Sequence, residues 1–553
     1  MPFLLLPAVL LIILPALLLA RRLGWLERRW QQGLAAGAGL MLVIDSWPQR
    51  GLELAILKQL YLLIAAAAAL LLLLRHYRIR WTLDPRRFDR ALAGLAILGV
   101  VAYCNFFAFH GVTDDGERTF VHLHDVAHYY LGAKYYPELG YTELYTAMLR
   151  AEAELHDDHF KAIEARDLAD YRRVHIRELL QRSDPVKAAF SPERWADFQR
   201  DVDVFRERLG PHYGTVLLDH GFNPTPVWAL AGGWLSNWVP AGSERGILLL
   251  TLLDPLILIA MFGIVGRTFG RRTALLTVIH FCVAFGATFG WVGGAFLRFP
   301  WLFGLVVGLC CLHRKRYELA GGLLAVATMT RVFPGFFLVP LAAKAVTVAW
   351  RRRELPRRYV ALFGGCLVTA VILALATLAL PRGASHWGEF HANMSNHLRN
   401  ISPNVVGLTE LLTLRLDAEQ TQVTGEEFEA LKARRQQLRN AQLWIVFVPL
   451  LALSAYLAPR RTDLGIAHLA LPLLYAGLSL AGYYYAVLMV AILVERSSPK
   501  RLSWIFAVEA LAYVLMLFET RDALVYVYRG ALVAWLYVGL NLQATHRVGG
   551  HCR

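Results

Sequence analysis

Long apolar stretches alternate with short polar connections along almost the whole chain. PFLLLPAVLLIILPALLLA at 2–20 and LAILKQLYLLIAAAAALLLLL at 54–74 are examples. Each is long enough to cross about 30 Å of hydrocarbon as a helix, and a helix satisfies its own backbone hydrogen bonds in lipid. The pattern predicts an all-α polytopic bundle of about 12–15 transmembrane helices. Crossings are expected near 3–20, 33–45, 52–74, 91–110, 246–266, 273–290, 300–313, 318–331, 335–350, 359–380, 441–458, 463–481, 483–495, 503–518 and 522–543.

Two long polar intervals interrupt this pattern, at 111–245 and 381–438. They divide the chain into N-terminal crossings (1–90), a helix leading into the first loop (91–110), a central bundle (246–380) and C-terminal crossings (439–553). In the first loop, 142–180 is charged and lacks Gly and Pro, and 191–210 begins Ser-Pro-Glu and ends in Gly, so we expect helices. The segment 223–240 is expected to be interfacial or re-entrant, anchored by Trp228, Trp234 and Trp238.

The distribution of charge gives this topology a direction. The chain has 553 residues, 56% of them hydrophobic, and a formal net charge of +15. The arginines cluster in the short connections, for example at 75–90, 267–272, 314–316 and 351–358. Since cytoplasmic loops are enriched in Lys and Arg, the two long loops are expected outside the cytoplasm, and the excess charge predicts no nucleic-acid partner. We expect a multi-pass protein of a membrane such as the bacterial inner membrane, in contact with its lipids.

The first loop opens with residues suited to acid–base chemistry, in TDDGERTFVHLHDVAHYYLGAKYYPELGYTELY (113–145). Asp125 could act as a general base on a sugar hydroxyl, and His124, His128, Tyr129 and Tyr130 could contact a sugar. The same residues also fit a solvated loop, with Asp114 and Asp115 in turns. A zinc site from His122, His124 and His128 is an alternative by ligand type. Because no Glu or Cys accompanies them at a recognised spacing, no metal or other cofactor is predicted.

Two further sets of residues are expected at the same face of the membrane. Arg298 and Arg331 lie near the outer ends of crossings, where a guanidinium suits a phosphate but also snorkels to the interface. The second loop carries His391, Asn393, His397, Arg399 and Asn404, which are apt for phosphate or sugar and are also ordinary loop residues. Four ionisable groups inside crossings, Asp254, His280, His468 and Glu509, are expected to have packing roles.

These motifs together resemble the GT-C superfamily of integral membrane glycosyltransferases. The resemblance is carried by Asp125-Val-Ala-His-Tyr-Tyr-Leu-Gly-Ala-Lys, Gly140-Tyr-Thr-Glu-Leu-Tyr145, Arg331-Val-Phe-Pro334, the His- and Asn-rich second loop, and Leu471-Pro472 to Gly482-Tyr-Tyr-Tyr485. It is nearest to the polyprenol-phosphate-mannose-dependent mannosyltransferases and covers about 91–495.

This resemblance implies a sugar donor linked to polyprenyl phosphate, a lipid or glycan acceptor, and a single inverting displacement. It also implies that Asp125 is the base, that Arg331 and the His and Asn residues of the second loop bind the donor phosphate, and that Tyr484 lies near the sugar. The sequence departs from the pattern in a long insertion (about 146–222) and in extra N-terminal helices, so the acceptor is not carried over.

Two other classes fit the same features. A transporter or flippase for lipid-linked or anionic solutes would show inverted repeats or broken midplane helices, and no clear repeat is visible. An O-antigen polymerase or ligase is also polytopic with a large outer loop, but it relies on Arg and His more than on an early acidic residue. Replacement of Asp125 distinguishes these classes from the glycosyltransferase.

Overall fold

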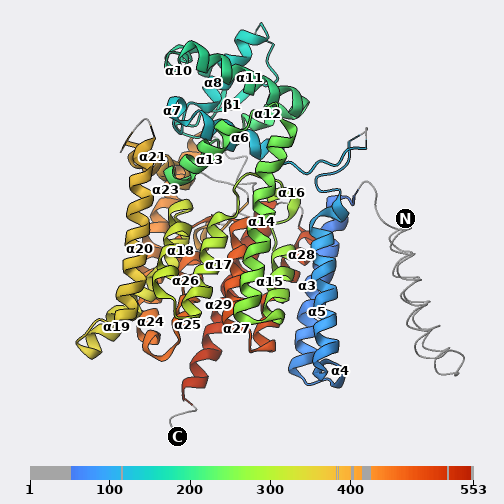
Figure 1. Ribbon diagram of the computed structural model, residues 1–553, viewed down its shortest axis with the longest axis vertical. Coiled ribbons are helices and arrows are strands. Elements are labelled where there is room, and N and C mark those ends of the chain that lie inside the picture. Colours follow the sequence, from blue (N-terminus) through green and yellow to red (C-terminus); the bar gives the residue numbers. More distant parts are fainter. Residues whose placement is uncertain are drawn as a thin grey trace, which may run out of the picture.

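The structure, a computed structural model, is a bundle of helices with a helical domain on one end (Figure 1). It describes residues 51–113, 116–157, 159–380, 383, 385–399, 404–413, 425–519 and 522–549. The crossings predicted at 3–20 and 33–45, and the turn residues Asp114 and Asp115, lie outside this range. The helical class predicted from the sequence is confirmed, because the described strands are only two to three residues long.

Six of the described helical segments are long and apolar enough to span a membrane. They are Leu54–His76, Glu244–Phe269, Phe333–Arg352, Arg357–Ala379, Ala430–Arg460 and Pro499–Phe518. The first, second and last are α3, α14 and α28, and the third contains η4 (Phe333–Phe337) and α19 (Leu338–Arg352). The fourth contains α20 (Arg357–Ala376) and η5 (Thr377–Ala379), and the fifth combines α23 (Gly425–Gln442), the π-helical turn η6 (Leu443–Phe447), α24 (Val448–Leu457) and η7 (Ala458–Arg460).

Shorter helices complete the bundle, and several are interrupted. The crossing predicted at 463–481 is divided into α25 (Asp463–Ala467) and α26 (Ala470–Gly477), and the next begins with the 3₁₀ element η8 (Gly482–Leu488) before α27 (Met489–Glu495). The remaining bundle helices are α4 (Arg80–Leu83), α5 (Pro85–Tyr103), η2 (Asn105–Phe107), α15 (Arg271–Val283), α16 (Phe289–Val292), α17 (Pro300–His313), α18 (Tyr317–Thr330) and α29 (Asp522–Gly549).

Small residues allow the closest helix contact, between α18 and α20. A Cβ atom on Gly321 would lie 1.9 Å from the carbonyl oxygen of Leu362, and one on Gly365 would lie 2.3 Å from that of Glu318. Close approach of backbones through small residues is the usual packing mode of helices in lipid. These two glycines therefore fix the distance between the two helices.

The helical domain comprises residues 123–238, and we call it the loop domain. Its core is a set of buried aromatic side chains, among them Phe198, Phe205 and Tyr213. The elements are α6 (Leu123–Lys134), α7 (Tyr136–Leu139), α8 (Leu144–Leu155), β1 (Glu164–Arg166), β2 (Arg173–His175), α9 (Ile176–Gln181), α10 (Asp184–Ala188), α11 (Pro192–Leu209), η3 (Gly210–His212), α12 (Tyr213–Val216) and α13 (Pro226–Trp238).

One prediction for this domain is correct, and a second is only partly so. The helix predicted at 191–210 is α11, with the Ser191 hydroxyl accepting from the Arg194 amide and Gly210 ending the helix at φ 54°. The interval 142–180 is not one continuous helical stretch, because β1 and β2 form an antiparallel hairpin within it. Asp167 stabilises the hairpin turn, since its carboxylate accepts from the amide of Ala169 and its backbone bonds to Tyr171.

The segment predicted to be interfacial is the helix α13, which the Thr225 side chain caps. Trp234 and Trp238 are exposed, as expected of interfacial anchors, but Trp228 is buried and donates to the carbonyl of Leu297 at 2.9 Å. Trp228 is therefore not an anchor in the interface. It attaches the loop domain to the connection before α17.

The second long interval begins with α21 (Ser385–Arg399) and reaches the bundle through a short antiparallel pairing. In it, β3 (Val405–Val406) lies beside β4 (Leu480–Ala481), and α22 (Leu408–Leu412) follows. The carbonyl of Asn404 accepts from the Gly482 amide at 2.7 Å. This pairing brings the end of the second loop against η8.

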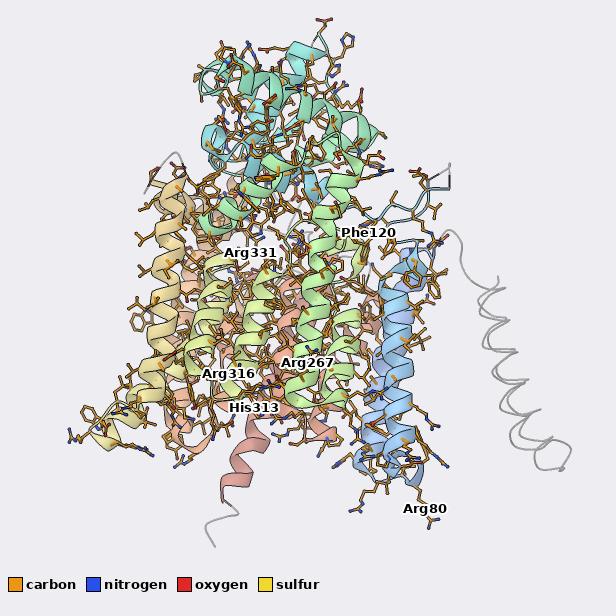
Figure 2. The ribbon with its side chains drawn as sticks, in the orientation of Figure 1. Arg80, Phe120, Arg267, His313, Arg316 and Arg331 are labelled. Carbon is orange, nitrogen blue, oxygen red and sulfur yellow. The ribbon has the colours of Figure 1, made fainter. Side chains whose placement is uncertain are left out.

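The two ends of the molecule differ in charge. Arg80, Arg267 and Arg316 lie at the end of the bundle away from the loop domain, whereas Arg331 lies near the loop domain (Figure 2). The basic connections that the sequence places on one side thus share one end of the bundle.

Candidate active site

A cavity of about 910 Å³ lies between the loop domain and the bundle. Its polar lining includes Asp125, Asp219 and Arg298. Apolar residues of the bundle also line it, among them Leu54, Leu57, Phe285, Tyr513 and Met516. Binding cavities of this size commonly hold ligands of drug size or larger. This combination of polar and apolar lining suits a molecule with a polar head and an apolar tail.

Asp125 lies in the first turn of α6 and is 8% exposed. Its Oδ2 atom pairs with the guanidinium of Arg298 and lies 3.8 Å from Nδ1 of His122. Burial alone would raise the pKa of this carboxyl, but the Arg298 guanidinium and the His122 ring outweigh it, so the pKa lies well below its usual range. Asp125 is therefore an ionised carboxylate held by a cation.

Arg298 is held in place by Asp254 of α14. The two carboxylate oxygens of Asp254 accept from the backbone amides of Arg298 and Phe299, at 2.7 and 3.0 Å. These amides precede α17, where backbone N–H groups have no partner within the helix. Asp254 was predicted to have a packing role. In the structure, it holds the backbone at Arg298 and so positions the Arg298 side chain that reaches the cavity.

Tyr129 connects the two arginines that the sequence singled out. Its hydroxyl lies 3.5 Å from Nη1 of Arg298 and 3.4 Å from Nη2 of Arg331. Arg331 follows the last residue of α18, is 8% exposed, and is not among the residues that line the cavity. Arg298 lines the cavity directly, and the ring of Tyr483 lies beneath its guanidinium at 5.1 Å. The Tyr129 hydroxyl therefore contacts two guanidinium groups, and of these Arg298 is the one that lines the cavity.

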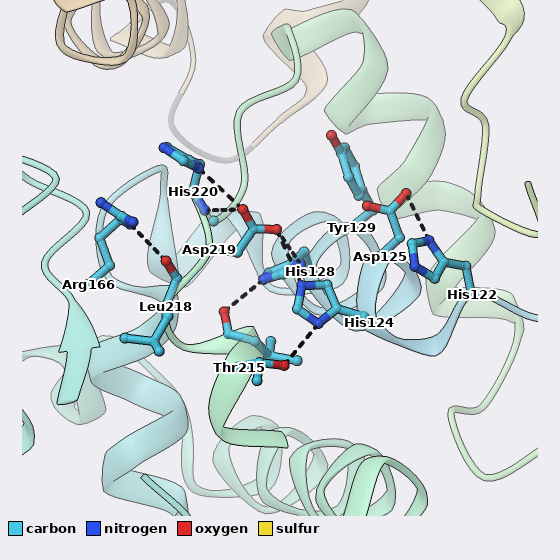
Figure 3. Close-up of polar contacts among 12 residues, drawn as sticks. His122, His124, Asp125, His128, Tyr129, Arg166, Thr215, Leu218, Asp219 and His220 are labelled. Atoms are coloured by element: carbon cyan, nitrogen blue, oxygen red, sulfur yellow. Dashed lines mark hydrogen bonds and ion pairs between the residues drawn. The ribbon is translucent and has the colours of Figure 1, made fainter. Parts of the chain in front are cut away.

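A second group of polar residues also lines the cavity, where His124 and His128 face Asp219 (Figure 3). Nε2 of His124 is 3.3 Å and Nδ1 of His128 is 3.9 Å from Oδ2 of Asp219. The other carboxylate oxygen accepts from the backbone amide of His220 at 2.8 Å. The two histidines are one helical turn apart on α6, and Asp219 comes from the connection after α12.

The predicted residues of the second loop are divided between the cavity and its surroundings. His397 and Asn404 line the cavity, and burial and the His220 ring lower the pKa of His397 to about 3, so its imidazole is neutral. Asn393 is buried and accepts from the Tyr171 hydroxyl at 3.0 Å, away from the cavity. His391 is exposed. Arg399 ends α21, and its side chain lies outside the described part of the structure.

Two predicted tyrosines also lie behind the cavity wall. The hydroxyl of Tyr130 donates to the carbonyl of Val239, the residue that follows α13. Tyr484 packs against Phe333 and Trp301, and its neighbour Tyr483 lines the cavity instead. The structure thus brings together Asp125, His124, His128, Tyr129, Arg298, His397 and Asn404.

The cavity residues that were missed from the sequence include Asp219, His220 and Tyr483. Asp219 is 95 positions from His124, and its only local signal is an Asp-His-Gly tripeptide between the helical segments and NPTP. His122 was considered only as a metal ligand. Its ring stacks on that of His110, with centroids 4.9 Å apart, and faces Asp125.

No protein-family model, curated protein or solved structure matches this chain. The resemblance to GT-C enzymes therefore stays a prediction.

Proposed function

We propose that this chain is a GT-C-type glycosyltransferase that moves a sugar from a polyprenyl-phosphate-linked donor to a lipid or glycan acceptor, on the extracytoplasmic face of a bacterial inner membrane. The observation that carries the proposal is the cavity that Asp125, Arg298 and Tyr129 line together with apolar residues of the bundle. The apolar lining suits a prenyl chain, and the guanidinium suits a phosphate.

In this mechanism the donor phosphate binds Arg298, with Tyr129 and the charge of Arg331 behind it. Arg298 then turns from the carboxylate of Asp125 to the phosphate. Loss of this cation raises the basicity of Asp125, because the opposite charge was the main factor that favoured ionisation. The base is thus activated only when the donor is present.

Asp125 next accepts the proton of an acceptor hydroxyl, and the hydroxyl oxygen attacks the anomeric carbon of the donor. The bond from this carbon to the phosphate oxygen breaks, and polyprenyl phosphate leaves with the electron pair. Arg298 and Arg331 stabilise the charge that develops on the leaving phosphate. The single displacement inverts the configuration of the anomeric carbon.

The variant Asp125→Asn tests this assignment in the purified full-length chain. We expect sugar transfer from polyprenyl-phosphate-linked donors to fall by about 10²–10⁴-fold, the usual contribution of a general base. Binding of decaprenyl phosphate can be measured without knowing which sugar is transferred. It should be kept or become tighter, because Arg298 no longer pairs with a charged Asp125. Asp203→Asn is the matched control, since Asp203 pairs with His156 in the loop domain outside the cavity.

Transfer that persists in Asp125→Asn would reject Asp125 as the base. Failure of the unaltered protein to bind decaprenyl phosphate would reject the lipid-linked donor. Movement of the lipid-linked sugar across the bilayer without transfer would instead favour the flippase alternative.

A further inference from the structure

The side chains of His124, His128 and Asp219 place three ligand atoms within 4.8 Å of one another. The closest of these contacts is 3.3 Å and the next is 3.9 Å. Around a tetrahedral zinc ion, ligand atoms at about 2.0–2.1 Å from the metal lie roughly 3.3 Å apart. Small side-chain movements would therefore bring all three atoms to bonding distance from one ion.

The nitrogens that would not bind the ion already have other partners. Nε2 of His128 lies 3.0 Å from the carbonyl of Val216 and 2.8 Å from the Tyr145 hydroxyl. Because the carbonyl is an acceptor, it favours the tautomer with the proton on Nε2 and leaves the lone pair of Nδ1 directed at Asp219. Metal-binding histidines usually donate their second N–H to a carbonyl or carboxylate in this way.

His124 has the reverse arrangement. Its Nδ1 lies 3.5 Å from the hydroxyl of Thr215, and this hydroxyl donates its own proton to the carbonyl of His212 at 2.7 Å. Thr215 is therefore an acceptor for Nδ1–H, which leaves the lone pair of Nε2 directed at Asp219 (Figure 3). The backbone amide of His220 holds the other oxygen of Asp219. In each of the three residues, a hydrogen bond to an atom that would not bind the ion holds the side chain in its orientation.

We propose that His124, His128 and Asp219 bind a divalent transition-metal ion of the zinc class, through Nε2, Nδ1 and Oδ2, respectively. Two imidazoles and one carboxylate suit zinc, and a site with three protein ligands keeps its fourth position open. All three residues line the cavity that contains Asp125, so the open position faces the space available to a ligand. An oxygen of a hydroxyl or phosphate group is the chemistry that such a position takes.

The proposed site differs from the one that the sequence offered. His122 is not a ligand, because its ring stacks on His110 and its Nδ1 faces Asp125. The carboxylate that completes the set comes from a distant part of the chain. The ion site follows from this geometry alone and does not depend on the proposed sugar transfer.

Cobalt(II) binding to the full-length chain, purified in detergent without a polyhistidine tag, tests the site. We expect one equivalent of Co²⁺ per chain with the visible absorption of a tetrahedral complex, and displacement of cobalt by Zn²⁺. The variants His124→Ala and Asp219→Asn should each weaken binding at least tenfold. His156→Ala is the matched control, because His156 also pairs with an aspartate, at 2.8 Å, but belongs to no group of three metal-ligand side chains among the described residues.

A further variant guards against misfolding as the cause of lost binding. His124→Cys keeps a ligand at this position, so it should restore cobalt binding and add a thiolate-to-cobalt charge-transfer band. The proposal is overturned if the unaltered protein binds Co²⁺ no more tightly than His124→Ala, or if the His124→Cys complex lacks the charge-transfer band. Sugar-transfer activity enters neither measurement, so failure of the metal site and failure of the proposed function are distinguishable.

Discussion

At the residue scale, the buried ion pair between Arg298 and Asp125 joins the two residues to which we assign the donor phosphate and the acceptor hydroxyl. Both side chains are buried, and a buried charge is tolerated only with a partner. In the proposed mechanism, the donor phosphate replaces Asp125 as the partner of Arg298, and the proton of the acceptor hydroxyl replaces Arg298 as the partner of Asp125. The ion pair would then hold both side chains in place until both substrates are bound.

Arg298→Gln tests the contribution of this ion pair to protein stability and to the binding of lipid phosphate. It leaves the Asp125 carboxylate buried without its cation, which should destabilise the protein by about 3–5 kcal/mol and weaken binding of decaprenyl phosphate. The double variant Asp125→Asn/Arg298→Gln removes both charges, so its thermal stability should recover while lipid-phosphate binding stays weak. Equal stability of the single and double variants would contradict the unpaired Asp125 carboxylate as the cause of the loss.

His110 gives the folded protein a dependence on pH. Its ring is stacked on His122, and its Nε2 lies 3.2 Å from the carbonyl of Gly293. Burial and the His122 ring lower the pKa of His110 to about 4, although Asp125 acts in the opposite direction. Since the unfolded chain binds this proton near pH 6.5, the stability contributed by neutral His110 is complete above that pH and is lost as the pH falls toward 4.

Between pH 7 and pH 5 this difference amounts to about 1–2 kcal/mol. His110→Gln should therefore flatten the loss of thermal stability that the unaltered protein shows over this range. The comparison variant is His76→Gln, which removes an exposed histidine at the end of α3. Melting temperatures in detergent at several pH values measure the effect, and identical slopes for His110→Gln and the unaltered protein would contradict it.

Local sequence revealed the residues of α6 but not their partners. His124, Asp125, His128 and Tyr129 lie in one short segment, so their shared location was predictable from helical spacing. Asp219 and Arg298 reach the same cavity from 95 and 173 positions away, and no local pattern encodes such a contact. The sequence likewise could not show which of Arg298 and Arg331 lines the cavity. That depends on the backbone before α17, whose amides at Arg298 and Phe299 donate to Asp254.

At the element scale, the contact of α18 with α20 shows how small residues set the dimensions of the bundle. Gly321→Ala would place a Cβ atom 1.9 Å from the carbonyl oxygen of Leu362, and a backbone atom cannot move aside as a flexible side chain does. We expect a loss of about 1–3 kcal/mol, typical of overpacking, seen as a lower melting temperature in detergent.

Gly364→Ala is the control on the same pair of helices. A Cβ atom there meets nothing within 4 Å among the described residues, so its melting temperature should match that of the unaltered protein. If the two variants behave alike, helix propensity rather than close packing explains the effect. Because both variants replace glycine by alanine in an apolar helix, the change in side-chain hydrophobicity is the same in the two.

Apolar length predicted the long helices better than their interruptions. The range Leu54–His76 of α3 agrees with the predicted crossing at 52–74 within two residues at each end. The agreement is expected because a continuous apolar segment in lipid must form a helix to satisfy its backbone hydrogen bonds. The break between α25 and α26 and the 3₁₀ start of η8 have no such signal. They depend on tertiary partners, such as the β3–β4 pairing that holds Gly482 against Asn404.

At the scale of the whole molecule, the loop domain and the basic connections lie at opposite ends of the bundle (Figures 1 and 2). If Lys and Arg mark the cytoplasmic side, the cavity opens on the other side, where lipid-linked sugars serve extracytoplasmic acceptors. The proposed function therefore requires a defined orientation in the membrane.

Cysteine labelling in intact cells tests this orientation. Ile163 in the loop domain is 74% exposed, and Tyr77 at the far end of α3 is 71% exposed. A membrane-impermeant maleimide should label Ile163→Cys in intact cells and Tyr77→Cys only after the membrane is permeabilised. The native cysteines at 104, 282, 310, 311 and 366 are buried or half-buried, and labelling of the unaltered protein measures their contribution. The reverse pattern would place the cavity in the cytoplasm, where a polyprenyl-linked donor for extracytoplasmic transfer would not meet it.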